Sequence, residues 1–352
     1  MDRVAYLVRR LLLVIPTFIG ITLICFTLTR FLPGGPVEMR LMQMRGMAAQ
    51  GGAGESAGSA TSANVSEEYK KELEKQFGFD RPFVVQYWDW LVNKRMGMNL
   101  ESYAFRNKTA WQLIKSRIPI SLWFGLASFL LTYMICIPLG IAKALRHRQA
   151  FDAASSVIVF IAYAIPSFAL AMSLKMLFCG TVEGLWDIFP LGGIASDNVY
   201  GEALGTWAIF KDRAWHMALP IACYVAGGFA MLTLLMKNSL LDQISADYVR
   251  TVIAKGATRK RAIWCHAFRN ALIPVATGLG GMIGLIFVGS IIIETIFEIP
   301  GMGRLSWDAL IGRDYSVFLA LLALTASFQL VGNIISDILY MIIDPRIDFS
   351  KK

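Results

Sequence analysis

Histidine, cysteine and acidic residues are all present in this sequence, but their spacing does not assemble them into a metal-binding or nucleotide-binding motif. The three histidines, His147, His216 and His266, fall in three different segments, and none belongs to an HExxH pattern. No GxxxxGK[ST] loop is present to hold the phosphates of ATP. We therefore expect no catalytic residue, no cofactor site and no metal site, and we expect this chain not to be an enzyme.

The five cysteines stand singly and contain no CxxC pair: Cys25, Cys136, Cys179, Cys223 and Cys265. Most of them fall in or beside apolar runs, where a free cysteine behaves as a small hydrophobic residue. We expect neither a structural disulfide nor a zinc site.

One stretch does have a spacing that indicates a function. The segment from Ser245 to Pro274 reads SADYVRTVIAKGATRKRAIWCHAFRNALIP; it is strongly basic and lies between two apolar runs. Apolar residues recur at helical spacing near its start and predict one stripe on a short helix: Tyr248, Val249, Val252 and Ile253.

The ends of this short helix are also marked. Ser245 is the predicted N-cap, and Asp247 lies in the first turn, where the helix dipole favours an acid. Gly256 is predicted to end the helix, because glycine enters the left-handed conformation without strain. Thr258 is predicted to cap a second helix that runs into the next apolar segment.

Two interpretations of this stretch remain open. Basic loops flank the cytoplasmic side of most membrane spans, so its charge alone could simply mark a tether. A tether needs neither an amphipathic stripe nor a glycine stop, and these two features favour a docking surface for a cytoplasmic partner.

The composition predicts an all-α, polytopic membrane protein. Hydrophobic residues make up 56% of the chain and charged residues 17%, whereas soluble domains have about 45–50% and about 25%. Six apolar runs each exceed the ~20 residues that a helix needs to cross the bilayer: 11–32, 118–142, 152–178, 214–236, 271–294 and 317–343. Backbone groups in lipid must be satisfied within their own segment, so these runs should be helices.

The orientation follows from the basic residues of the short connections. The N-terminus, the second connection and the fourth are basic, whereas the third and fifth lean acidic. Both termini are therefore predicted in the cytoplasm. The net charge of +9 is explained by this inside bias, so no nucleic-acid partner is expected.

We divide the chain into three parts. Residues 1–32 form the cytoplasmic N-terminal end and first span, and residues 33–117 form an external loop. That loop contains a flexible low-complexity segment at 46–66, rich in Gly, Ala and Ser, followed by an amphipathic helix and an aromatic segment that should lie along the membrane surface. Residues 118–352 form the core, with five spans and the cytoplasmic coupling loop 237–270.

Several residues within the core could serve transport or packing. Pro166, in AIPSF, should kink the third span, and with Phe168 it is a candidate for lining a pathway. Glu294 ends an apolar run, so it is either a pathway or gate residue or a simple interfacial acid. Gly280 and Gly284 form a GxxxG pair that predicts close helix packing.

Motifs across nearly the whole chain resemble a known family, the permease subunits of ABC importers for dipeptides and oligopeptides. The similar segments are RFLPGGPV, YVRTVIAKGA, HAFRNALIPV, GSIIIETIFEIPGMGRL, DYSVFLA and the terminal DPRID. Within this family, the FGFDRPFVVQYWDWL pattern and the DPRIDF ending are most similar to the B-type permeases of the Yej importers of oligopeptides and microcin C.

The resemblance implies the six-span fold of a type I ABC importer in the bacterial inner membrane. It also implies partners: a second homologous permease, two cytoplasmic ATPases that bind ATP and Mg²⁺, and an external peptide-binding protein. The stretch Asp247–Gly256 corresponds to the family's coupling helix. The docking residues so implied are Asp247, Tyr248, Arg250, Thr251, Ala254, Lys255, Gly256, Ala257, Thr258 and Arg259.

The chain departs from the family pattern at two places. The hallmark Glu-Ala-Ala of the coupling helix reads Arg250-Thr251-Val252, and the trailing Ile-x-Leu-Pro reads His266-Ala267-Phe268-Arg269. Any contact of residue 250 with an ATPase would therefore not be acidic.

The alternative function is a secondary transporter of a polar solute driven by an ion gradient, which predicts ionisable residues at mid-bilayer and inverted repeats.

Overall fold

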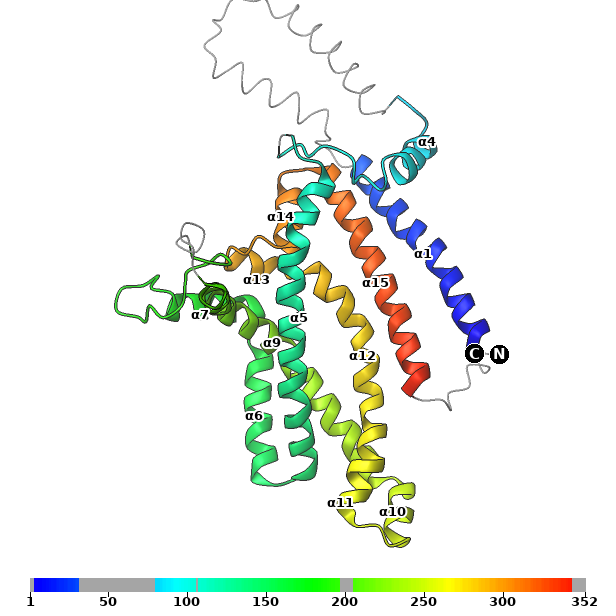
Figure 1. Ribbon diagram of the computed structural model, residues 1–352, viewed down its shortest axis with the longest axis vertical. Coiled ribbons are helices and arrows are strands. Elements are labelled where there is room, and N and C mark those ends of the chain that lie inside the picture. The colour runs from blue at the N-terminus through cyan, green and yellow to red at the C-terminus, as the bar shows by residue number, and fades with distance from the viewer. Residues whose placement is uncertain (1–2, 32–79, 106, 197–204, 344–352) are drawn as a thin grey trace, which may run out of the picture. The chain divides into compact units, whose positions relative to one another are not determined.

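The computed structural model describes residues 3–31, 80–105, 107–196 and 205–343 (Figure 1). Within these ranges the chain is helical, and the β pairing is limited to two single antiparallel bridges, Glu101 with Thr109 and Cys179 with Asp187. This confirms the predicted all-α class for the described residues. The predicted low-complexity segment 46–66 and the amphipathic helix after it lie outside them.

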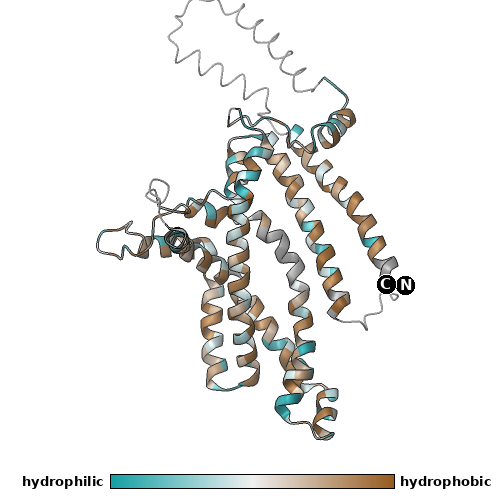
Figure 2. Cartoon of the chain, viewed as in Figure 1, coloured by the Kyte–Doolittle hydropathy of each residue, from teal (hydrophilic) through white to brown (hydrophobic). Residues whose placement is uncertain are grey.

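Among the residues that the structure describes, four helices are long and apolar enough to cross a membrane. They are α1 (Arg3–Phe31), α5 (Ala110–Leu145), α9 (Thr206–Ser245) and α15 (Tyr315–Ile343). Figure 2 shows that hydrophobic residues dominate these helices, as the composition predicts. Each begins before its predicted apolar run, and α5 also continues through Pro138 to Leu145, whereas the sequence predicted an end near residue 142.

The third predicted span is broken. It consists of α6 (Ala150–Ala164) and α7 (Ser167–Phe178), which meet at an angle of 94° and together could form a fifth span. Ile165 adopts an extended conformation before Pro166, as the residue before a proline prefers, and this ends α6. The predicted kink at Pro166 is thus confirmed, but as a sharp break rather than a bend in a continuous helix.

The fifth predicted run, 271–294, also differs from the structure. Helix α12 (Phe268–Val288) ends before Gly289, which has a φ of +72°, and a separate short helix, α13 (Ile291–Ile296), follows. Ser290 caps α13 by accepting a hydrogen bond from the Ile293 N–H at 3.4 Å. Glu294 therefore lies in α13, outside α12.

The chain forms two compact units. The first contains residues 1–13, 117–304 and 328–352, and the second contains residues 14–116 and 305–327. In the second unit, Phe26 of α1 packs against Tyr87 of α4 (Phe83–Trp88) and Trp90 of the π-helix Asp89–Asn93. Tyr87 and Trp90 are buried there, so the aromatic segment forms a core, although Trp88 is exposed.

The first unit carries the predicted docking stretch. Its α9 contacts α6, α7 and α12 and ends close to α10 (Asp247–Ala254). Figure 1 shows α10 and α11 (Arg259–Ala262) at the end of the α9 and α12 pair. A buried apolar cluster ties α9, α10, α11 and α12 together and includes Leu240, Val249, Ala262 and Ala271.

Candidate docking surface

Helix α10 is separate from α9 because Ala246, which lies between them, is not helical. Ala246 has φ −69° and ψ 147°, an extended conformation, and its side chain offers no capping bond. The prediction of Ser245 as N-cap is wrong. Ser245 is the last residue of α9, and its hydroxyl donates back to the carbonyls of Leu241 and Asp242 at 3.1 and 3.0 Å. Serine makes such local back-bonds readily, so the same residue type suits either role.

The predicted glycine stop is confirmed. Gly256 has a φ of +90°, and its N–H donates to the Ile253 carbonyl at 2.9 Å. The Ala257 N–H donates to the Val252 carbonyl at 3.3 Å, so two carbonyls at the end of α10 are satisfied. No heavy atom lies within 4 Å of the position where a Cβ of residue 256 would be. Backbone conformation, rather than lack of space, therefore requires glycine.

Thr258 caps the second helix as predicted. Its hydroxyl accepts a hydrogen bond from the Arg261 N–H at 3.3 Å. Helix α11 continues through a π-helical turn, Ile263–Ala267, into α12. The docking stretch is therefore joined to long helices on both sides: to α9 by one extended residue and to α12 without interruption.

The inner face of α10 holds the helix in place. Val249 is 2% exposed, and Val252 packs partly buried against the same apolar cluster. The predicted stripe is only half correct, because Tyr248 and Ile253 are 37% and 42% exposed. The Tyr248 hydroxyl donates to Gln243 Oε1 at 2.7 Å and accepts from Asn270 Nδ2 at 3.1 Å, so it links the bases of α9 and α12.

The residues of the predicted docking set are mostly accessible. Nine of the ten residues are exposed, and Ala257 is half-buried; the exposed ones are Asp247, Tyr248, Arg250, Thr251, Ala254, Lys255, Gly256, Thr258 and Arg259. Arg250 and Asp247 form an ion pair at 3.6 Å with side chains 75% and 97% exposed. Such an exposed pair contributes little to stability. The face is therefore a basic, accessible surface on a helix whose opposite side is buried.

Glu294 is buried, whereas an acid at the membrane interface would face water. It is 1% exposed and accepts hydrogen bonds from the Arg304 N–H at 2.8 Å and from the Ser121 hydroxyl at 3.3 Å. Side chains at Gly289 or Gly301 would collide with its carboxyl group, and a side chain at Gly303 would collide with the backbone of Ser290 and Ile291. Burial raises the pKa of this carboxyl to about 7, although the hydrogen bonds act in the opposite direction. This arrangement makes Glu294 a junction between α5, α13 and α14 (Met302–Ile311).

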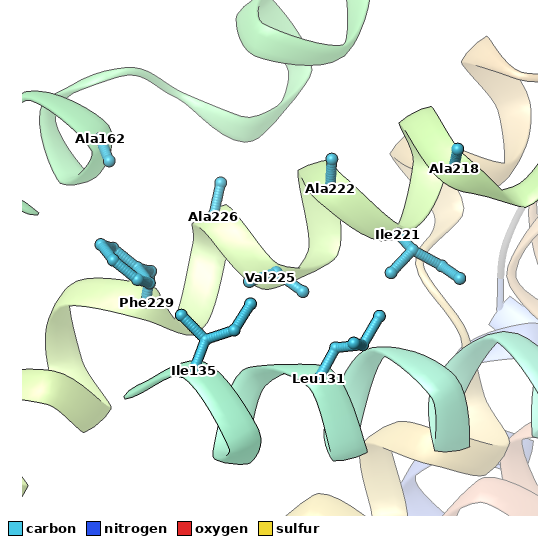
Figure 3. A pocket seen from close by; sticks show the side chains of 9 residues that line it. All are labelled: Leu131, Ile135, Ala162, Ala218, Ile221, Ala222, Val225, Ala226 and Phe229. Carbon is cyan, nitrogen blue, oxygen red and sulfur yellow. The ribbon is translucent and has the colours of Figure 1, made fainter. Parts of the chain in front are cut away.

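The other pathway candidates lie at the broken span. Pro166 and Phe168 are exposed at the junction of α6 and α7. A groove of about 400 Å³ lies nearby, between α5, α6 and α9 (Figure 3). It is lined by Leu131, Ile135, Ala162, Ala218, Ile221, Ala222, Val225, Ala226 and Phe229. No lining side chain is polar, so the groove offers contacts only to apolar groups, and it includes none of the three pathway candidates.

The predicted packing of the GxxxG pair concerns residues whose contacts the structure does not describe. Gly280 and Gly284 lie in α12, but the packing of these residues is outside what the structure describes. Close helix approach is instead found at Gly140 of α5. A Cβ there would lie 2.7 Å from the Met236 Cβ and 2.8 Å from the Thr233 carbonyl oxygen of α9.

Two lysines, one buried and one partly buried, make contacts that the sequence did not predict. Lys143, used only as a marker of the cytoplasmic side, is 0% exposed and contacts Asp152. Lys175 of α7 donates to the Ile296 carbonyl at 2.7 Å and contacts Glu298 at 3.4 Å. The signal for Lys143 was the nearby acid Asp152 at the start of the next apolar run, but sequence alone does not show that they meet.

Together, the long apolar helices are typical of an integral membrane protein, and in the first unit the basic helix α10 is accessible. Residues 136–349 match the family described as binding-protein-dependent transport system inner membrane component. The chain belongs to this family. It is thus a multi-pass inner-membrane component of ABC transport.

Full-length relatives support the same assignment. The chain is 38% identical to the peptidoglycan transport system permease protein YejB of Agrobacterium fabrum, over 99% of each chain. It is also 38% identical to the inner membrane ABC transporter permease protein YejB of Escherichia coli O157:H7, over 98% of this chain and 99% of the relative. Identity to the oligopeptide transport system permease protein AppB of Bacillus subtilis is 34%, over 98% and 99%.

Proposed function

We propose that this chain is the permease subunit of an ABC importer that carries di- and oligopeptides across the inner membrane. The observation that carries the proposal is the exposed face of α10, fixed by the burial of Val249 and ended by Gly256. A helix that is anchored on one side and accessible on the other is suited to fit a groove in a partner. In a member of this family, the partner that such a helix fits is a cytoplasmic ATPase.

The proposal includes the arrangement in the membrane. Six spans are formed by α1, α5, the α6–α7 pair, α9, α12 and α15, with both termini in the cytoplasm. A second homologous permease completes the pathway, two ATPases bind beneath, and an external binding protein delivers the peptide. This chain itself hydrolyses nothing and binds no cofactor; ATP and Mg²⁺ bind to the ATPases.

The peptide class rests on the relatives, whose names include oligopeptide, dipeptide and peptidoglycan transport systems. Peptides are the chemistry shared by most of these names. Microcin-C-like peptides are within the same class, and the Yej-type relatives support testing them. The apolar groove of Figure 3 could contact such substrates only through nonpolar groups, so selection by charge would rest with the binding protein.

The test uses the complete importer: this chain with its partner permease, the ATPases and the binding protein, purified together and reconstituted into vesicles. Uptake of a labelled tetrapeptide should require ATP and the binding protein and should be insensitive to proton and sodium ionophores. Uptake that needs an ion gradient and no ATPase would instead establish the secondary transporter. Failure of the ATPases to co-purify with this chain would contradict the docking role of α10.

A further inference from the structure

Three charged side chains meet in the first unit where α5, α6 and α9 come together. Asp152, near the start of α6, accepts hydrogen bonds from Lys237 of α9, whose Nζ lies 2.7 and 2.9 Å from the two carboxylate oxygens. Lys143, near the end of α5, contacts the same carboxylate at 3.2 Å. The side chains of Lys143, Asp152 and Lys237 are 0%, 8% and 12% exposed, so the cluster is almost completely removed from solvent.

Further polar groups contact Lys143 and Asp152. Lys143 Nζ also donates to the Asp152 carbonyl at 3.1 Å and to the hydroxyls of Ser155 and Ser156 at 2.9 and 2.8 Å. The Arg148 N–H and the His147 ring each lie 3.3 Å from Asp152 Oδ2. Buried charges are stable only when they are paired and hydrogen-bonded, and these contacts provide that pairing for Lys143 and Asp152.

Close packing explains how α5 and α9 both reach the carboxylate. At Gly140 the two helices approach so closely that a Cβ would collide with Met236 and Thr233. Gly140 lies three residues before Lys143, and Met236 lies directly before Lys237. The two lysines are therefore delivered to Asp152 by the same helix crossing.

The position of the cluster connects it to the docking surface. Lys237 precedes Ser245, the last residue of α9, by eight residues of unbroken helix. That is about 12 Å along the helix axis at 1.5 Å per residue. One extended residue later, α10 begins. A short, continuous segment of the chain therefore connects α10 with Lys237.

We propose that Asp152 and Lys237 are positioning residues for transport: their ion pair fastens α9 to α6, so that movement of α10 is carried into the α6–α7 pair. This inference rests on the proposed function, since it concerns how an ATPase bound at α10 drives the pathway. The two lysines differ in this respect. Lys143 ties α5 to α6, which a short turn already joins, whereas Lys237 is the link to α9.

The test compares Lys237→Met, Lys237→Arg and Lys143→Met in the complete reconstituted importer. Peptide uptake and ATP hydrolysis are measured on the same vesicles, and the coupling ratio is peptide transported per ATP hydrolysed. Lys237→Met should lower this ratio at least fivefold while ATP hydrolysis persists, since coupling between sites commonly amounts to about 5- to 150-fold. Lys237→Arg should restore it, because it keeps the charge. Lys143→Met should keep the ratio close to the wild-type value.

The outcomes separate this inference from the proposed function. ATP-driven peptide uptake by the wild-type importer tests the proposed function by itself. The inference is overturned if Lys237→Met keeps the wild-type ratio. It is also overturned if Lys237→Met and Lys143→Met lower uptake and hydrolysis in equal proportion to the loss of assembled complex, because a purely structural role predicts that result.

Discussion

Replacing Gly256 by valine should weaken ATPase docking while leaving the membrane core intact. Gly256 has a φ of +90°, and a Cβ at this position would meet no atom within 4 Å. The cost of the substitution is therefore conformational: about 1–2 kcal/mol for an L-residue held in the left-handed region, with β-branching adding to it. Because the residue is exposed, this cost should fall on the end of α10 rather than on the core.

The size of the expected effect follows from that cost. If the docked form requires the native end of α10, then 1–2 kcal/mol reduces the competent fraction about 5- to 30-fold. The affinity of the purified permease pair for its ATPases, measured in detergent by biolayer interferometry, should fall by that factor. Uptake in vesicles should fall with it, whereas the amount of permease inserted into membranes should not.

Gly184→Val is the matched control. Gly184 also has a positive φ, +88°, and also has nothing within 4 Å of its Cβ position, but it lies in the loop after α7. It should suffer the same local strain without affecting ATPase affinity. The reasoning is refuted if Gly256→Val binds the ATPases as tightly as wild type, or if Gly184→Val weakens binding equally.

Three further outcomes are expected. Gly140→Ala should lower the thermal midpoint in detergent by the equivalent of about 1–3 kcal/mol, because its Cβ would lie 2.7 Å from the Met236 Cβ, whereas Gly227→Ala, with nothing within 4 Å, should not; equal midpoints would contradict the close crossing. Ser121→Ala should cost about 1–3 kcal/mol in the same assay, since the Met302 N–H loses its acceptor at 2.7 Å, whereas Ser116→Ala, which removes a bond within its own helix, should cost less. The pKa of Glu294 is about 7 in the folded protein and 4.5 in the unfolded chain, so the folded protein loses stability as the pH rises between these values. The thermal midpoint of the wild type should therefore fall between roughly pH 5 and pH 8, and Glu294→Gln should lack that part of the decline. Parallel pH profiles of the two proteins would contradict a titration of Glu294 in this range.

The local features of the docking stretch could be predicted because they depend on residues close in sequence. Gly256 ends α10 as expected because few residue types adopt its φ of +90°, and Thr258 caps α11 as expected because its hydroxyl accepts a hydrogen bond from the Arg261 N–H. Ser245 was assigned wrongly for the same local reason: its hydroxyl can satisfy carbonyls of its own helix as well as cap the next one. Tyr248 does not lie in the predicted buried stripe. Its hydroxyl instead forms hydrogen bonds with Gln243 and with Asn270, and Asn270 is distant in sequence.

Several buried polar contacts could not be predicted, because they join residues far apart in the chain. Lys237 meets Asp152 across 85 positions, and Ser121 meets Glu294 across 173. Apolar periodicity and charge counts report which side of the membrane a residue favours, but they do not report its partner. The broken third span was visible in Pro166, although its 94° angle depends on how α6 and α7 pack against α9.

The most direct test of the central claim is protection of α10 by the ATPases from the cytoplasmic side. Thr251→Cys would be introduced into a chain carrying Cys265→Ser, since Cys265 is itself exposed. A membrane-impermeant thiol reagent should label this position in inverted inner-membrane vesicles stripped of the ATPases, and adding the ATPases back should block the labelling. Labelling only from the outer side, or labelling that the ATPases leave unchanged, would contradict the account.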